Sequence, residues 1–147
     1  MRLKELLAEG RLKRHRTSAR EVADLLRVVD RDLSDAAIPQ LSTDRRFATA
    51  YNAALQLATI ALCAAGFRAS GSGHHWLTFH VLPEIMGLHH SDRAYYLDNC
   101  RSKRNTTDYD RAGEVSAAEA EELLAEAIAF RTDLIEWLMD KHRDLLM

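Results

Sequence analysis

Apolar residues recur at intervals of three and four along most of the chain, which is the spacing of one face of an α-helix. Between Ser18 and Pro39 this face consists of Val22, Leu25, Leu26, Val29, Leu33, Ala36 and Ala37. Ser18 and Glu21 have the spacing of a capping box, and Pro39 disfavours helix at the residue before it. The pattern therefore predicts a first long helix that begins at Ser18 and ends before Pro39.

The next apolar pattern covers more than one face. After a cap at Ser42 or Thr43, the main stripe consists of Phe47, Tyr51, Ala54, Leu55, Ala58, Leu62 and Ala65. Leu57, Ile60 and Cys63 lie on other faces of the same helix, which Gly66 is expected to end. Because a helix that is apolar nearly all round must be covered on every side, we expect it at the centre of a bundle.

Four further segments show helical spacing: a short piece ended by Gly10, residues 74–86 with a kink at Pro83, a helix from Ser91, and a last helix from the capping box at Ser116. The strict alternation typical of strands is absent. We therefore predict an all-α protein, an antiparallel bundle of four to five helices. It forms one domain, residues 1–147, in which residues 1–16 are a basic N-terminal extension.

Composition fits a globular protein, with 47% hydrophobic and 29% charged residues and a net charge of −2. Cys63 and Cys100 both lie within helical patterns, which favours a reducing compartment and a core role. No signal peptide is evident, and the richest apolar stretch, Ala53 to Gly66, is too short for a membrane span. We expect a cytoplasmic protein without a membrane partner.

The helix that begins at Ser91 changes character along its length. Its inward face starts with Ala94 and Leu97 and, at about 100° per residue, continues with Arg101, Arg104, Asn105 and Asp108, flanked by Tyr109. An inward guanidinium is costly unless it is paired or lines a cleft. Two interpretations stay open. Either Arg104 pairs with Asp108 at a bundle end while Asn105 bonds a loop, or the helix lines a groove for phosphate or RNA.

The segment Arg104-Asn105-Thr106-Thr107-Asp108-Tyr109, preceded by Arg101, resembles the signature region of the HEPN domain family. Other segments are similar to these proteins in the same order: Ala50-Tyr51-Asn52-Ala53-Ala54, Gly71-Ser72-Gly73-His74-His75 and the closing acidic helix. HEPN domains are helical bundles that usually dimerise, and in dimers their motifs face a shared cleft. Many are ribonuclease toxins paired with a nucleotidyltransferase-like antitoxin.

The resemblance implies roles for individual residues. Arg104 stands at the motif arginine and anchors phosphate with help from Arg101, while Asn105 fills the following polar position. Tyr109 stands where the family has histidine, and a phenol with a pKa of about 10 is a poor base at neutral pH. Its remaining roles are to donate a proton or to bond a phosphate. Arg111 occupies the position of the tyrosine that some antitoxins adenylylate, so this regulation is not expected.

Histidines elsewhere are candidates for the missing imidazole. His74 or His75 either folds toward Arg104 or simply helps to start its own helix. The pairs His74-His75 and His89-His90 lack the spacing of known metal motifs, so we expect no metal and no cofactor. The basic N-terminus, from Arg11 to Arg16, either contacts RNA phosphates or packs on the acidic last helix.

Taken together, these features predict a HEPN-like protein that binds RNA or nucleotides, with Arg104 and Tyr109 as candidate catalytic residues. It is either a ribonuclease toxin with a degenerate motif or a non-catalytic interaction module that partners a nucleotidyltransferase. Ligand contacts are expected from Arg101, Asn105, Asp108, His74 and His75. Surplus apolar surface for so small a bundle favours a homodimer.

Overall fold

The computed structural model describes the backbone of residues 2–109 and 115–146 and the side chains of residues 3–105 and 115–146. Four helices are long: α2 (Ala19–Ala36), α3 (Thr43–Ala64), α6 (Ser91–Tyr109) and α7 (Ala117–Lys141). The short elements are α1 (Arg2–Ala8), β1 (Leu12–Arg14), β2 (Phe67–Ala69), α4 (His74–His80), α5 (Leu82–Met86) and the 3-10 turns η1 (Leu88–His90) and η2 (Arg143–Leu146).

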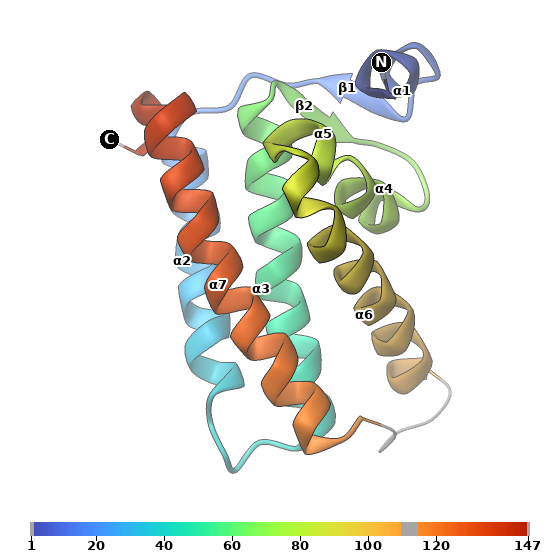
Figure 1. Ribbon diagram of the computed structural model, residues 1–147, viewed down its shortest axis with the longest axis vertical. Coiled ribbons are helices and arrows are strands. Elements are labelled where there is room, and N and C mark those ends of the chain that lie inside the picture. The colour runs from blue at the N-terminus through green and yellow to red at the C-terminus, as the bar shows by residue number, and fades with distance from the viewer. Residues whose placement is uncertain (1, 110–114, 147) are drawn as a thin grey trace.

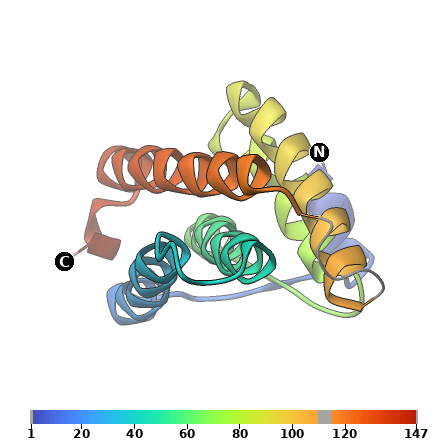
Figure 2. The same ribbon diagram turned by 90° about the horizontal axis from the view of Figure 1, so that it is seen from below.

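Helix α3 lies at the centre of the bundle, as its apolar character predicts (Figure 1). Helices α2 and α7 pack on one side of it, and α4 and α6 on the other (Figure 2). By length and composition α3 could cross a membrane, but 67% of its most apolar 18-residue window is buried inside the protein. That burial is what a core helix requires. Consecutive long helices run in opposite directions, so α7 runs parallel to α3, on which it packs.

Helix boundaries follow the polar and proline signals in the sequence. Ser42 caps α3 by accepting the Arg45 N–H, and Ser116 forms a complete capping box with Glu119. The break between α4 and α5 lies at Val81, and Pro83 stands in the first turn of α5, where a residue without an N–H is tolerated. Helix α6 begins at Ser91, as predicted, but Ser91 follows η1 directly and has helical dihedral angles, so it is not an N-cap.

The start of α2 departs from its predicted capping box in one respect. Ser18 accepts the Glu21 N–H at 3.1 Å, as expected. The Glu21 carboxylate turns away from this cap, accepts the Thr17 hydroxyl at 2.6 Å and lies 2.7 Å from His15 Nε2.

The described residues form a helical bundle, as predicted, but they also contain a two-stranded sheet that the all-α prediction did not include. β1 and β2 pair antiparallel, with Leu12 opposite Ala69 and Arg14 opposite Phe67. Strands of three residues are too short to show an alternating pattern, which is why the sequence conceals them. This strand pairing makes residues 3–14 part of the folded domain, although the sequence predicts an N-terminal extension there. A second apolar cluster joins them to α3 and α4: Leu3, Leu6, Leu12, Leu62, Leu77 and Val81.

Candidate functional site

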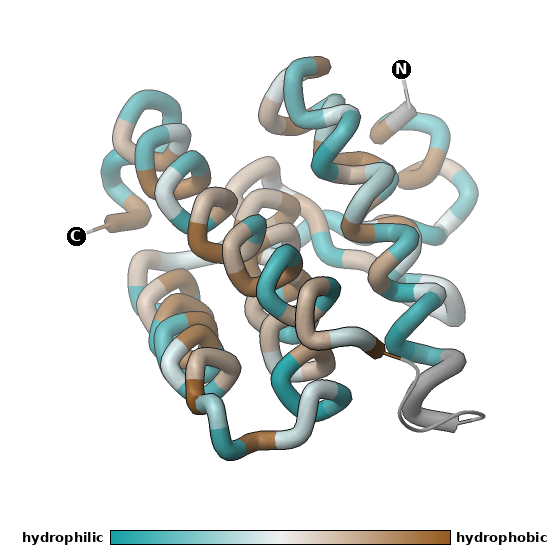
Figure 3. The backbone as a smooth tube through the Cα atoms, turned by 60° about the horizontal axis from the view of Figure 1, so that its bottom comes forward, coloured by the Kyte–Doolittle hydropathy of each residue, from teal (hydrophilic) through white to brown (hydrophobic). Residues whose placement is uncertain are grey.

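The inward stripe of α6 is apolar first and polar afterwards. Ala94, Leu97 and Cys100 are buried, while Arg101, Arg104 and Asn105 are half-buried. Figure 3 shows the hydrophilic colouring of this end of α6. The predicted face is thus confirmed through Asn105. The side chains of Asp108 and Tyr109, and all of Arg111, lie outside the described residues.

Arg104 packs against the central helix. Its Cζ lies 5.6 Å from the centroid of the Tyr51 ring, within the range of a cation–π contact. Its Nη1 also lies 3.5 Å from Asn105 Oδ1, at the limit for a hydrogen bond. Tyr51 is 1% exposed, so the ring is a fixed platform for the guanidinium.

Arg101 lies on the same stripe and is held within α6. Its Nε donates to Asp98 Oδ1 at 2.7 Å, one turn earlier. The side chains are 27% and 34% exposed, so solvent reaches both partners. Lys103 lies on another side of α6, where its Nζ is 3.5 Å from Glu119 of α7. Of the basic residues described at this end of α6, the two arginines therefore face the candidate site and the lysine secures the helix.

His75 is brought to the same platform from α4. Its Nδ1 lies 3.4 Å from Tyr51 Oη, and the two ring centroids are 6.2 Å apart. His74 is exposed, and its ring meets His75 edge-on at 4.5 Å. Of the two histidines that the sequence offered, His75 is the one that lies beside Tyr51 together with Arg104.

The electrostatics of this cluster keep its two central groups neutral. Burial lowers the pKa of His75 below its usual value, and His74 and the charges of Arg104 and Arg101 lower it further. Burial raises the pKa of the Tyr51 hydroxyl, although the two arginines oppose that shift. At neutral pH the site therefore combines two guanidinium cations with an uncharged imidazole. When His75 Nδ1 carries the proton and donates to Tyr51 Oη, its Nε2 can accept another.

An open pocket lies beside Asp98, the residue that pairs with Arg101. It has a volume of about 490 Å³ and is lined by Trp76, His80, Pro83, Ser91, Ala94, Tyr95 and Asp98. The rings of Trp76 and His80 stack with centroids 4.5 Å apart, and Tyr95 is 73% exposed. Asp98 belongs both to this pocket and to the Arg101 pair. The sequence contains no signal for this pocket, because no spacing rule relates α4 to α6.

The second histidine pair lies in a different setting. His90 is buried near Arg93, whose guanidinium also pairs with Glu126 and Asp133 of α7. Arg93 lies 4.9 Å over the Phe130 ring. Burial is the main cause that lowers the pKa of His90, followed by Arg93. These ion pairs link α6 to α7, and the charge of Arg93 is balanced within the network by Glu126 and Asp133.

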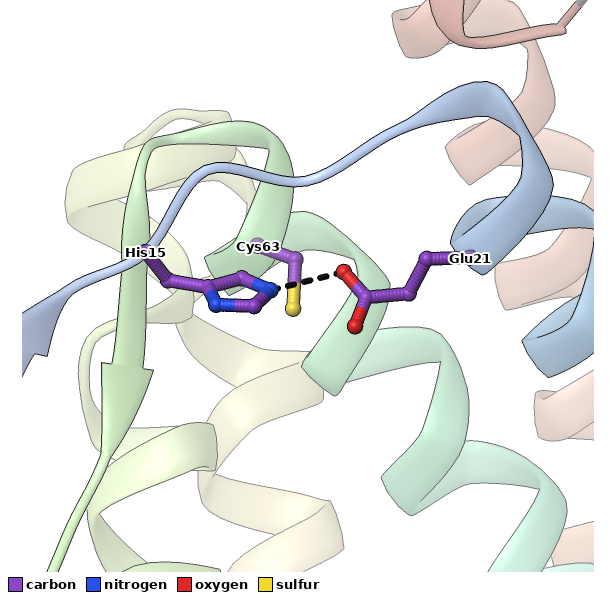
Figure 4. Close-up of side chains that lie close together, drawn as sticks. All are labelled: His15, Glu21 and Cys63. Atoms are coloured by element: carbon purple, nitrogen blue, oxygen red, sulfur yellow. Dashed lines mark hydrogen bonds and ion pairs between the residues drawn. The ribbon is translucent and has the colours of Figure 1, made fainter.

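A third cluster consists of His15, Glu21 and Cys63 (Figure 4). Among the described residues, it is the one group of three or more His, Cys, Asp or Glu ligand atoms that lie within 4.8 Å of one another. Neither histidine pair named in the sequence analysis belongs to it. The sequence gives no spacing signal for it, because its members come from three separate segments.

Comparisons with protein-family models, with curated proteins and with solved structures find no match to this chain.

Proposed function

We propose that the protein is a HEPN-like RNA-binding protein whose site is formed by Arg101, Arg104 and Asn105 of α6 and His75 of α4. One observation carries the proposal: the Arg104 guanidinium and the His75 imidazole both contact the buried Tyr51, and the charge of Arg101 acts on the same imidazole. Guanidinium groups are suited to phosphate, because their planar N–H groups can bind two oxygens at once. A neutral imidazole beside them is suited to proton transfer.

The same arrangement supports metal-independent cleavage of RNA. Arg104 and Arg101 hold the phosphate, and His75 Nε2 removes the proton of the neighbouring 2′-hydroxyl. The 2′-oxygen then attacks phosphorus, the bond to the 5′-oxygen breaks, and that oxygen takes up a proton. Tyr109 is the proposed donor, in the place where the HEPN motif has histidine. The products are a 2′,3′-cyclic phosphate and a 5′-hydroxyl.

The pocket beside Asp98 is the proposed binding site for a nucleobase. Tyr95 offers an exposed aromatic face, whereas the Trp76 ring already stacks on His80 and lies under the Arg11 guanidinium. Bases stack on exposed aromatic faces with little sequence preference. A base seated here lies next to Arg101 through their shared neighbour Asp98. His74, exposed at the start of α4, is a peripheral contact in this proposal.

A homodimer and a nucleotidyltransferase-type antitoxin are the proposed partners. Leu88, an apolar side chain that is 81% exposed, is a proposed contact for such a partner. In the alternative function the protein does not cleave RNA, and its polar stripe only shapes the contact with such a partner. The pairing of Arg101 with Asp98 within α6 favours this alternative.

A cleavage assay in EDTA separates the two functions. We expect purified protein to cut single-stranded RNA and to leave cyclic phosphate ends detectable by mass spectrometry. His75→Gln should lower the rate by about 100-fold or more, the contribution typical of a general base. His74→Gln is the matched control and should stay within a few-fold of the parent.

Overexpression in growing cells provides a second test. Growth arrest by the parent chain and normal growth with Arg104→Ala support a toxin. Equal growth with both chains, together with intact RNA in the purified assay, would overturn the ribonuclease proposal. RNA binding without cleavage would favour the interaction module instead.

A further inference from the structure

We propose that His15, Glu21 and Cys63 bind a transition-metal ion of the zinc type at the end of the bundle that carries the N-terminal segment. The proposal is independent of RNA binding, since none of the three residues belongs to the α6 site. Figure 4 shows the three side chains converging from separate segments, with the Cys63 sulfur beside the line that joins His15 to Glu21. Their ligand atoms all lie within 4.8 Å of one another.

The distances between these ligand atoms are close to the distances between the ligand atoms of a bound zinc ion. Zinc bonds of about 2.0 to 2.3 Å in tetrahedral geometry place neighbouring ligand atoms about 3.3 to 3.8 Å apart. His15 Nε2 and Glu21 Oε1, now 2.7 Å apart, must therefore separate by roughly half an ångström to admit the ion. The widest pair must close by at most about 1.5 Å, which side-chain rotation at a partly exposed site supplies.

Hydrogen bonds from neighbouring residues hold two of the three ligand residues, His15 and Glu21, in position. His15 donates its backbone N–H to the Gly66 carbonyl at 2.9 Å, which fixes it beside the end of α3. Thr17 donates its hydroxyl to Glu21 Oε1 at 2.6 Å. Such a bond to a ligating carboxylate is typical of the outer shell of metal sites. In a complete capping box the Glu21 carboxylate would accept the backbone N–H of Ser18, but here it contacts Thr17 and His15 instead.

The donor set selects the class of metal. An imidazole nitrogen, a carboxylate oxygen and a thiolate sulfur suit zinc and its neighbours in the first transition row, whereas the sulfur disfavours magnesium and calcium. Three protein ligands leave a fourth position for water. His15 and Glu21 have side chains 24% and 39% exposed, so an ion can enter from solvent, while Cys63 is 6% exposed below them.

Binding would join the N-terminal segment to the bundle. His15 follows β1, Glu21 belongs to the first turn of α2, and Cys63 belongs to the last turn of α3. Burial raises the pKa of the Cys63 thiol to about 11 in the protein without metal. On coordination the thiol loses its proton to solvent, and the sulfur is shared with the ion.

Cobalt(II) titration of the full chain, reduced and stripped with EDTA, tests the site. We expect one equivalent to produce a thiolate-to-cobalt charge-transfer band and the visible bands of four-coordinate cobalt, both removed by zinc. Cys63→Ser should abolish the charge-transfer band, and Cys100→Ser, which removes the other buried thiol, should retain it. Glu21→Gln should weaken cobalt affinity at least tenfold.

Two results would overturn the proposal. One is a folded parent chain, judged by circular dichroism, that shows no charge-transfer band at millimolar cobalt. The other is a band that disappears with Cys100→Ser and persists with Cys63→Ser. Should Cys63→Ser fail to fold, His15→Ala and Glu21→Gln decide: unchanged cobalt affinity in both variants excludes this site.

Discussion

Two of the three polar clusters, the one at Tyr51 and the one at Cys63, are built on α3 and differ in the sign of the charge beside their imidazole. Each has a buried α3 side chain, Tyr51 or Cys63, beneath an imidazole that another segment supplies. At Tyr51 the neighbours of the imidazole are guanidinium groups. At Cys63 the neighbour is a carboxylate. The comparison indicates that the partner charge decides the ligand: cations around His75 suit an anion, and the anion beside His15 suits a cation.

The largest expected effect on ligand binding comes from reversing a charge in one cluster and measuring the ligands of both clusters. Arg104→Glu should reduce affinity for single-stranded RNA by about 100-fold, since a lost phosphate contact is replaced by repulsion. The same variant should keep the cobalt charge-transfer band. Glu21→Gln should do the opposite, losing cobalt and keeping RNA affinity. Fluorescence anisotropy and absorption spectra measure the two, and a variant that loses both ligands would contradict the separation of the clusters.

Zinc should stabilise the folded protein through the cluster of His15, Glu21 and Cys63 alone. At a free concentration 100 times its dissociation constant, a ligand of the native state contributes about 2.7 kcal/mol. For a chain of this size that corresponds to a Tm increase of about 5 to 10 °C. Scanning calorimetry should show this increase in the parent chain and in Arg104→Ala, and should not show it in Glu21→Gln. An increase that survives Glu21→Gln would place the ion elsewhere.

Much of the architecture is readable from the sequence, because helix faces and caps are local properties. Ser42, Ser116 and Pro83 each act where their chemistry predicts. The inward turn of Arg101 and Arg104 follows from the angular spacing of α6. These features depend on residues three or four positions apart, which is the range that periodicity describes.

The features that periodicity misses join distant segments. Leu12 pairs with Ala69 across a three-residue strand, and His15 meets Cys63 only because that pairing exists. In the same way, Tyr51 links α6 to His75, although no spacing relates the three. The capping-box pattern correctly predicts that Glu21 lies in the first turn of α2. It does not predict the position of the Glu21 carboxylate, which contacts His15 and Thr17 instead of the cap.

The platform of the first cluster should tolerate loss of its hydroxyl but not of its ring. Tyr51→Phe keeps the buried ring and removes only a contact of 3.4 Å, so we expect a loss of about 0.5 to 1 kcal/mol in the free energy of unfolding. Tyr51→Ala should cost about 3 to 5 kcal/mol, as a large cavity does. Urea denaturation measures both. Equal losses would show that the hydroxyl, rather than the ring, supports the site.

The smallest expected effect is a dependence of stability on pH. His75 and His90 hold a proton less tightly in the folded chain than in the unfolded chain, where the pKa is about 6.5. Between that value and the lower folded pKa the unfolded state binds more protons, so stability falls as pH falls through this window. Tm should decrease from pH 7.5 to pH 5.5, and His75→Gln should flatten part of the decrease. A parent Tm that rises on acidification would contradict this account of the histidines.

The most direct test of the RNA site is the salt dependence of RNA affinity in Arg104→Ala. Arg131→Ala is the matched control, because Arg131 pairs with Asp30 between α7 and α2, away from the site. We predict that Arg104→Ala weakens binding about tenfold and reduces the slope of log K against log salt by roughly one, as the loss of one phosphate contact requires. Arg131→Ala should change neither quantity. Identical affinities and slopes in the parent chain and both variants would contradict the assignment of Arg104 as a phosphate anchor.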